Sequence, residues 1–193
     1  KDGRAVTGGE DGKIAIWKPG VPAPERTFEG HTAPVVALAI SPDGNAIASA
    51  SWDRTIRVWP VAGGAPRVLD GHSQNVNGVA FTAGGRSLVS AGYDATVRIW
   101  PLSGNAAPVV ATLPAALNAV AVADDGDIGA AGANGHIYFV SLRGELTGAL
   151  EIAEMDLDVA RSLDAQVWGQ GFPAPQFNDD FVVQNQRVVG ENH

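Results

Sequence analysis

The fold is decided by residues 49–59, SASWDRTIRVW, because this stretch recurs along the chain with little change. Residues 90–100 read SAGYDATVRIW, and residues 8–17 read GGEDGKIAIW. Each copy ends in a tryptophan, and an aspartate lies six residues before that tryptophan. A phrase that returns at a fixed interval of roughly 20 to 50 residues indicates repeated structural units packed side by side.

The interval between copies is about 41 residues. A Gly-His pair ends at His31 and again at His72, 41 positions later. The tryptophans Trp17, Trp59 and Trp100 follow one another at spacings of 42 and 41. The chain of 193 residues therefore holds two complete units, a partial unit before them and room for one more after them.

Each unit predicts four short antiparallel strands. Two stretches of alternating apolar residues follow the Gly-His pair, and a turn rich in Gly, Pro or Asp separates them. A third stretch, rich in β-branched residues, leads to the tryptophan, and Val68-Leu69 lies in a fourth. The expected strands are 35–40, 46–50 and 55–59 in one unit and 76–81, 87–91 and 96–100 in the next, with turns at 41–44 and 82–85.

This arrangement resembles the WD40 repeat, which has Gly-His near its start and Trp-Asp near its end. The family's final Asp is replaced here by Lys18, Pro60 or Pro101. The resemblance implies a mainly β fold, an incomplete WD40 β-propeller of about 3.5 four-stranded blades. We expect it to cover residues 1–142, with blades at about 1–20, 21–62, 63–103 and 104–142.

The resemblance also implies a structural lock in each complete blade, made by hydrogen bonds among His, Ser, Asp and Trp. Hydrogen bonds to a charged group each stabilise a fold by about 1.5–3 kcal/mol. The first unit retains only Thr7, Asp11 and Trp17 of such a set. In the fourth unit, Leu113, Ala130, Asn134 and Val140 stand at the four positions. The two complete sets are His31, Ser49, Asp53 and Trp59, and His72, Ser90, Asp94 and Trp100.

Trp52 and Tyr93 precede the aspartates of the two complete units. In WD40 propellers this position faces the rim of the central channel, so the resemblance implies a protein-binding site there. Two interpretations stay open: the aromatic rings anchor a partner, or they pack on the neighbouring blade.

The repeat pattern stops near Ser141, and residues 153–193 predict a short α/β tail with a helix at 156–163 and strands at 181–183 and 187–189. Residues 168–177, WGQGFPAPQF, and 186–193, QRVVGENH, resemble the C-terminal OB-type region of the bacterial RecJ family of single-strand-specific exonucleases. That resemblance implies contact with single-stranded DNA through the tail, where Trp168 and Phe172 either stack on bases or pack under their loop. Residues 143–152 are the expected junction.

Composition excludes several kinds of function. There is no cysteine, so no thiolate metal site or cysteine nucleophile is available. A net charge of -8 disfavours nucleic-acid binding over the whole surface. We expect no cofactor and no metal, because His31 and His72 fit core positions and the acidic residues 124–127 fit a hairpin turn. No targeting or membrane-spanning segment can be read, so a soluble chain is expected while its compartment is not predicted.

These observations favour a non-catalytic WD40 scaffold that binds a protein partner. The alternative function is the DNA-binding part of a RecJ-like exonuclease without its nuclease centre. We also expect that an incomplete propeller can self-associate through its open strand edges.

Overall fold

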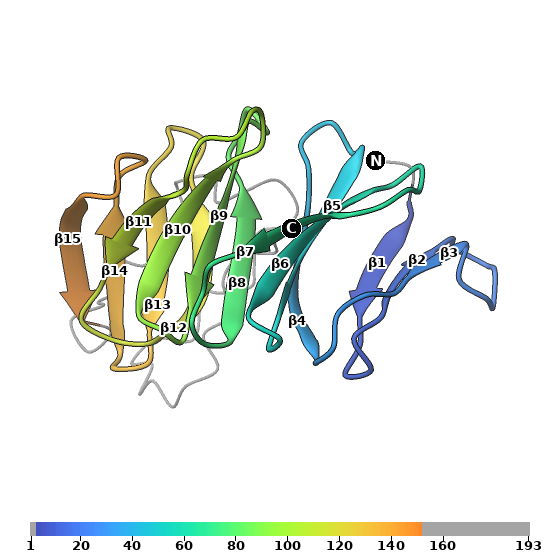
Figure 1. Cartoon of the computed structure of the whole chain (residues 1–193), viewed down its shortest axis with the longest axis horizontal. Helices are drawn as coiled ribbons and strands as arrows, with labels where there is room; N and C mark the ends of the chain where they lie inside the picture. Colours follow the sequence, from blue (N-terminus) through green and yellow to red (C-terminus); the bar gives the residue numbers. More distant parts are fainter. Residues whose placement is uncertain (1–2, 152–193) are drawn as a thin grey trace, which may run out of the picture.

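The computed structural model describes residues 3–151, which form four antiparallel sheets (Figure 1). All fifteen elements of this part of the chain are β-strands. The first sheet contains β1 (Ala5–Gly8), β2 (Ile14–Trp17) and β3 (Arg26–Phe28), and the second contains β4 (Val35–Ile40), β5 (Ala46–Ser51), β6 (Thr55–Pro60) and β7 (Arg67–Asp70). The third contains β8 (Val76–Phe81), β9 (Ser87–Gly92), β10 (Thr96–Pro101) and β11 (Val109–Thr112), and the fourth contains β12 (Leu117–Val122), β13 (Ile128–Gly132), β14 (His136–Val140) and β15 (Leu146–Glu151).

The predicted mainly β fold with four-stranded blades is confirmed in the last three sheets, whereas the first has three strands. Each sheet is offset by one strand from the sequence unit. The unit at 21–62 contributes β3 to the first sheet and β4, β5 and β6 to the second. Neighbouring sheets are therefore linked by each sequence unit.

The fourth sheet extends further than the sequence predicts. We expected the repeats to end near residue 142, yet β15 (Leu146–Glu151) pairs with β14 and completes the sheet. This strand lies inside the segment 143–152 that we expected to be a junction. Its sequence, LTGALE, has few β-branched residues and no closing tryptophan, so its pattern alone does not mark it as a strand.

Tight turns with local hydrogen bonds connect the strands. In the turn between β4 and β5, Ser41 Oγ donates to Asp43 Oδ1, and the N–H of Ala46 donates to Ser41 Oγ. The N–H of Gly44 donates to the carbonyl of Ser41, and Gly44 has a φ of 75°. Glycine adopts this left-handed conformation without a steric cost, which explains the Pro-Asp-Gly signal.

The core consists of three apolar layers, one between each pair of neighbouring sheets. Ile14 and Phe28 meet Ile47 between the first two sheets. Ile56 and Leu88 lie in the middle layer. Val89, Val97, Leu117 and Ile128 are among the residues of the third layer. Because a middle sheet is covered on both faces, alternate residues of one strand enter two different layers.

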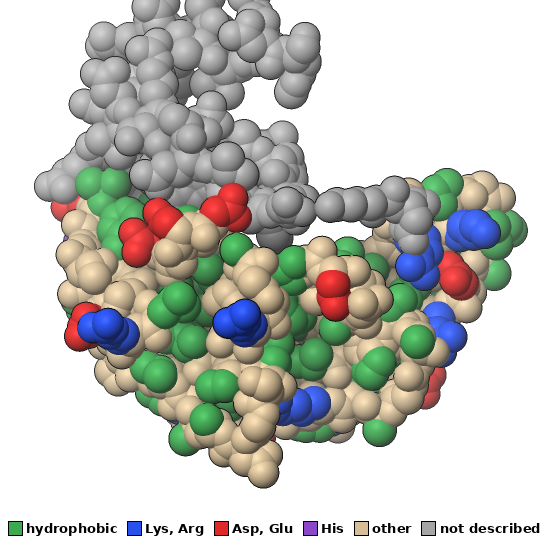
Figure 2. Space-filling view, turned by 90° about the horizontal axis from the view of Figure 1, so that it is seen from above, with side chains coloured by type: hydrophobic (Ala, Val, Ile, Leu, Met, Phe, Trp, Pro, Cys, Tyr) green, Lys and Arg blue, Asp and Glu red, His purple; other side chains and the backbone are tan. Residues whose placement is uncertain are grey.

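The four sheets follow one another in chain order, and the innermost strands of the last three lie beside each other: β4 beside β8, and β8 beside β12. Seen from above, the described residues form an open curved body on which hydrophobic, basic and acidic side chains are interspersed (Figure 2). The α/β tail predicted for 153–193, including Trp168 and Phe172, lies outside the described residues.

Candidate functional site

The structure joins His31, Ser49, Asp53 and Trp59 in one chain of hydrogen bonds, which we call the first network. His31 Nε2 lies 2.7 Å from Ser49 Oγ, and His31 Nδ1 lies 2.7 Å from Asp53 Oδ2. The Trp59 Nε1–H donates to Ser49 Oγ over 2.8 Å. The sequence predicted these four side chains as one set, and the structure brings them together.

The direction of these hydrogen bonds follows from the donors available. Because Ser49 Oγ accepts from Trp59, its own hydrogen is free to be donated to His31 Nε2. His31 then carries its proton on Nδ1 and donates it to the Asp53 carboxylate. A neutral imidazole with this tautomer satisfies every member of the first network, which matters because Ser49 has no exposed surface.

The second network repeats this geometry with His72, Ser90, Asp94 and Trp100. His72 Nε2 lies 2.8 Å from Ser90 Oγ, and His72 Nδ1 lies 3.0 Å from both carboxylate oxygens of Asp94. The Trp100 Nε1–H donates to Ser90 Oγ over 2.8 Å. Two sheets are therefore built around the same arrangement.

Each network includes a threonine that we did not predict. Thr55 Oγ1 and the Thr55 N–H both donate to Asp53 Oδ1, at 2.7 and 2.9 Å. Thr96 makes the same two bonds to Asp94, at 2.8 and 3.2 Å. The signal was present in the sequence, because Asp-x-Thr recurs in both complete units.

An arginine lies over each network tryptophan, which the sequence also did not suggest. The guanidinium carbons of Arg57 and Arg98 lie 5.9 Å from the ring centroids of Trp59 and Trp100. This distance fits a cation–π contact. A Cβ at Gly30 would lie 2.8 Å from Nη1 of Arg57 and 3.1 Å from Cη2 of Trp59. The glycine of the Gly-His pair thus leaves room for both side chains.

Burial shifts the pKa values of the ionisable groups in both networks. It lowers the pKa of His31 and of His72, and the neighbouring carboxylate opposes this shift only in part. Burial alone would raise the pKa of Asp53 and Asp94, but the hydrogen bonds they accept, first of all those from Thr55 and Thr96, lower it overall. At neutral pH each network therefore contains a neutral imidazole and a charged carboxylate.

The networks place Ser, His and Asp in contact, and this arrangement resembles the order of groups in serine hydrolases. The serine, however, is enclosed. Ser49 and Ser90 have no exposed surface, and each hydroxyl oxygen is occupied by a tryptophan N–H. A substrate carbonyl has no access to either oxygen, so this geometry is suited to holding a sheet together.

The first sheet contains part of the same arrangement. The Trp17 Nε1–H donates to Thr7 Oγ1 over 2.8 Å, as Trp59 does to Ser49. Asp11 Oδ1 accepts the N–H of Lys13 over 3.1 Å. In the complete networks a histidine links the aspartate to the hydroxyl that the tryptophan binds. The three histidines of the described residues have other partners, so no histidine links Asp11 to Thr7 and Trp17.

The fourth sheet replaces the network with apolar packing. Leu113, Ala130 and Val140 are buried in the third core layer together with Tyr138. The Asn134 Nδ2–H donates to the Tyr138 hydroxyl over 2.8 Å. Tyr138 holds the position that Arg57 and Arg98 hold in the two complete units, two residues before the position of the tryptophan, and it is buried.

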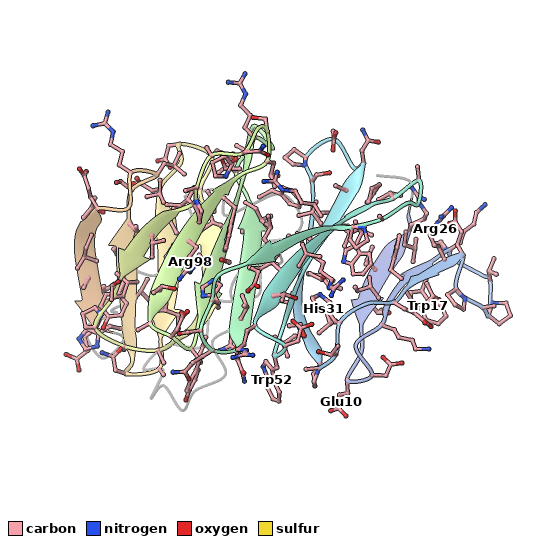
Figure 3. The ribbon with its side chains drawn as sticks, viewed as in Figure 1. Glu10, Trp17, Arg26, His31, Trp52 and Arg98 are labelled. Carbon is pink, nitrogen blue, oxygen red and sulfur yellow. The ribbon has the colours of Figure 1, made fainter. Side chains whose placement is uncertain are left out.

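Trp52 and Tyr93 lie at the surface, 48% and 49% exposed. They line a shallow depression of about 460 Å³. Figure 3 shows Trp52 and Glu10, which holds the same position in the first unit, at the same end of their sheets. We call this surface the aromatic face, and its residues are Val36, Trp52, Asn75, Asn77, Tyr93 and Asn118.

The aromatic face is held by hydrogen bonds between neighbouring sheets. The Trp52 Nε1–H donates to Asn77 Oδ1 over 3.2 Å, and Asn77 Nδ2 donates to the carbonyl of Leu117 over 2.9 Å. Trp52 belongs to the second sheet, Asn77 to the third and Leu117 to the fourth. The Trp52 ring therefore contacts the neighbouring sheet and leaves about half of its surface exposed.

The described part of the chain contains no group of three or more His, Cys, Asp or Glu side chains placed to hold a metal. Asp125 Oδ1 accepts the N–H of Asp127 within the hairpin between β12 and β13. His136 stacks on Tyr138 with a centroid distance of 6.0 Å. Within residues 3–151 there is also no helix of the length and apolar character needed to cross a bilayer.

Residues 22–60 and 64–101 match the WD40 family, described as "WD domain, G-beta repeat". Together with the sheet topology, these matches support a partial WD40 β-propeller formed by the described residues. The chain is 42% identical over 59 residues to the small ribosomal subunit protein RACK1 of Candida albicans, covering 31% of this chain and 16% of that protein. It is 36% identical over 74 residues to human coronin-7, covering 33% and 8%.

A further match is to the single-stranded-DNA-specific exonuclease RecJ of Salmonella typhimurium, 49% identical over 55 residues, covering 27% of this chain and 10% of that protein. It partly supports the resemblance of the tail to that family. The chain spans only 8% to 16% of the length of these relatives. The WD40 repeats support a role as a protein-interaction scaffold in a family that is generally not enzymatic.

Proposed function

We propose that the chain is a non-catalytic scaffold that binds a protein partner through the aromatic face. The observation that carries this proposal is the exposure of two neighbouring large aromatic rings, Trp52 and Tyr93, around one depression. Tryptophan and tyrosine at the centre of an interface contribute most to binding energy. RACK1, whose name places it in the small ribosomal subunit, is a relative that functions within a larger assembly.

The backbone of both aromatic residues is fixed before a partner arrives. The N–H of Trp52 donates to the carbonyl of Pro34, and the N–H of Tyr93 donates to the carbonyl of Asn75. Together with the bond from the Trp52 ring to Asn77, these contacts reduce the entropy that binding would cost. A pre-organised aromatic pair with nearby Asn side chains suits a partner that presents an apolar group beside polar backbone.

The face is confined to the middle of the described propeller. At the corresponding positions, the first sheet has Glu10 and the fourth has Ala133. Neither offers an aromatic anchor, so a partner should lie mainly across the second and third sheets.

Photo-crosslinking tests this proposal and identifies the partner in the same step. A benzophenone amino acid is placed at residue 52, at residue 93 or, as a matched control, at Leu146, an exposed residue of the outermost strand β15. In lysate of the source organism, the proposal expects one protein to be crosslinked from both 52 and 93 and not from 146. Identical products at all three positions, or none at 52 and 93, would contradict it.

We also propose that the first and second networks are structural locks with no catalytic role. Two observations support this proposal. Ser49 and Ser90 are completely buried, and in each network the side chains are joined by hydrogen bonds from the tryptophan through the serine and histidine to the aspartate. Loss of one hydroxyl should therefore appear as a loss of stability.

The second candidate function is single-stranded DNA binding through the tail, supported by the RecJ match over 55 residues. An electrophoretic mobility shift with a single-stranded oligonucleotide, repeated at rising salt, tests it. Phosphate contacts should give a shift at low salt that weakens as salt rises. Absence of a shift at low salt would remove this function.

Self-association through open strand edges is a third proposal, supported by an arc of four sheets that the described residues do not close. Multi-angle light scattering measures it directly. A monomer at all concentrations tested would contradict it.

A further inference from the structure

Three residues of the aromatic face stand at irregularities of the innermost strands. The register of β4 against β5 skips Val36, that of β8 against β9 skips Asn77, and that of β12 against β13 skips Asn118. Each is the extra residue of a β-bulge, which is left unpaired in the ladder and often re-aims a side chain beside a binding site. All three line the same depression, so the bulges supply this face with its side chains.

The aromatic face is uncharged, although the chain as a whole has a net charge of -8. Asp53 and Asp94 follow the two rings in sequence, but their side chains are only 6% exposed and accept hydrogen bonds inside the networks. Arg54 lies in the exposed turn beyond and does not line the depression. A charged group placed on the rings would lose hydration without meeting an opposite charge, so the segment that fits this face is uncharged.

Two of the three asparagines on this face keep their side-chain amides available. Asn77 is already engaged, because it joins Trp52 to Leu117. Neither Asn75 nor Asn118 makes a side-chain hydrogen bond to any described residue. Each amide offers N–H donors and a carbonyl acceptor. The face therefore provides hydrogen-bonding groups suited to a peptide backbone.

The recurring modes of peptide recognition differ in what the surface must supply. An added β-strand needs free backbone groups, but the N–H groups of Trp52 and Tyr93 already donate to backbone carbonyls. An amphipathic helix needs a long apolar groove, whereas this depression of about 460 Å³ has only Val36 and the two rings as apolar lining. Acidic and phosphorylated motifs need a cluster of arginines, and no arginine lines the depression in the described part of the chain. A polyproline II segment needs aromatic rings, which this face has.

A polyproline II segment also suits a shallow surface. This conformation has three residues per turn and no internal hydrogen bonds, so its carbonyls are free to accept from a partner. A proline-rich segment adopts it before binding and loses little entropy, which matters where the contact area is small. Trp52 and Tyr93 belong to neighbouring sheets, so each ring can receive one of two prolines on the same side of the segment.

We infer that the aromatic face binds an uncharged, proline-rich segment of its partner in the polyproline II conformation, with proline at every third position. This inference rests on the proposed function. The proline rings pack on Trp52 and Tyr93, and the amides of Asn75 and Asn118 donate to backbone carbonyls of the segment. Because proline has no N–H, the asparagines act here as donors.

Two arrays of labelled, uncharged peptides of about nine residues, or three turns of this helix, test the inference by fluorescence anisotropy with the full chain. Proline holds every third position in one array, with the other positions varied, and alanine replaces each proline in the second array. We expect saturable binding in the first array, at least about tenfold tighter than that of the alanine counterparts. Trp52→Ala and Tyr93→Ala should each weaken binding at least about tenfold, whereas Leu146→Ala, at an exposed residue of β15, should leave it unchanged.

Asn118 distinguishes this mode from binding of other extended peptides. Asn118→Asp keeps the shape of the side chain but replaces its N–H donor by an acceptor. Binding should weaken about fivefold, as in Asn118→Ala, because a proline-rich backbone offers few N–H groups to the new carboxylate. Undiminished binding by Asn118→Asp would show that the segment donates to this residue, which contradicts the polyproline II mode.

Equal binding of the proline and alanine arrays, or no binding of either, would overturn the inference. Binding of the neutral sugar cellohexaose that is lost in Trp52→Ala, without binding of peptides, would reassign the face to a carbohydrate. The crosslinking experiment separates this inference from the function on which it rests. A protein crosslinked from residues 52 and 93 through a segment without prolines would refute the polyproline II mode and leave the scaffold function in place, whereas no crosslinked protein would contradict the scaffold function and this inference with it.

Discussion

Replacing Ser49 by alanine removes the one atom that joins Trp59 to His31. In the structure, Ser49 Oγ accepts the Trp59 N–H at 2.8 Å and lies 2.7 Å from His31 Nε2. The substitution leaves an indole N–H and an imidazole nitrogen in a site that water does not reach. The backbone of β5 has no reason to change, because alanine fits the same strand conformation.

The magnitude follows from these two orphaned groups. A buried polar group without a partner costs about 1–3 kcal/mol, so the two orphaned groups of Ser49→Ala should lower the free energy of unfolding by about 2–6 kcal/mol. That is a large share of the roughly 5–15 kcal/mol that stabilises a typical domain. The hydroxyl itself contributes little packing, so most of the loss is electrostatic.

Urea unfolding followed by tryptophan fluorescence and circular dichroism measures this loss, with Ser87→Ala as the matched control. Ser87 lies in β9 and is only half-buried, and its backbone N–H and carbonyl, rather than its hydroxyl, bond to Thr82. The control should change stability by less than about 0.5 kcal/mol. If Ser49→Ala and Ser87→Ala were equally mild, the first network would not be a lock.

Three further predictions concern pH, backbone conformation and packing. The pKa values of His31 and His72 are lowered in the folded state, so below the ordinary value of 6.5 the unfolded chain binds protons that the folded chain does not. Their contribution to stability is therefore fully present above pH 6.5 and is lost as the pH falls toward the folded pKa. The urea midpoint should be lower at pH 5.5 than at pH 8, and an unchanged midpoint would refute this. Ala95 has a φ of 60°, a left-handed conformation that glycine adopts without steric strain. In Ala95→Gly the strain relieved should exceed the extra conformational entropy of the unfolded chain, so thermal unfolding should show stability raised by about 0.5–1 kcal/mol. A lower melting temperature would count against strain at this turn. Gly30→Ala places a Cβ 3.1 Å from Cη2 of Trp59 and should lower the free energy of unfolding by about 1–3 kcal/mol. An unchanged free energy of unfolding would show that Arg57 and Trp59 move aside freely.

Much of the fold could be predicted because the repeated phrase ties local pattern to tertiary position. The spacing from Gly-His to Trp placed β4, β5 and β6 within about a residue of their bounds in the structure. The resemblance to the WD40 repeat, rather than the spacing itself, grouped His31, Ser49, Asp53 and Trp59, which come from different parts of the unit. One copy of the phrase would not have sufficed; its return 41 residues later gave each position a structural meaning.

The parts that escaped prediction depend on contacts between neighbouring sheets or on weak strand patterns. Packing of Trp52 on the neighbouring blade was one of two interpretations left open, but no spacing within a unit identifies Asn77 of the next sheet as its partner. β15 has one β-branched residue, Thr147, and its pairing with β14 holds it in the sheet instead. Tyr138 is buried in the third core layer and accepts a hydrogen bond from Asn134, a contact that has no equivalent in the two complete units.

The most direct test of the scaffold function is the affinity of the protein crosslinked from residues 52 and 93, measured by titration against the wild-type chain and the Trp52→Ala/Tyr93→Ala double variant. Both rings are about half exposed, so their removal should leave the fold intact by circular dichroism. Loss of two central aromatic anchors should weaken binding by at least about 30-fold. A dissociation constant within about threefold of the wild-type value would contradict the assignment of the aromatic face as the binding site.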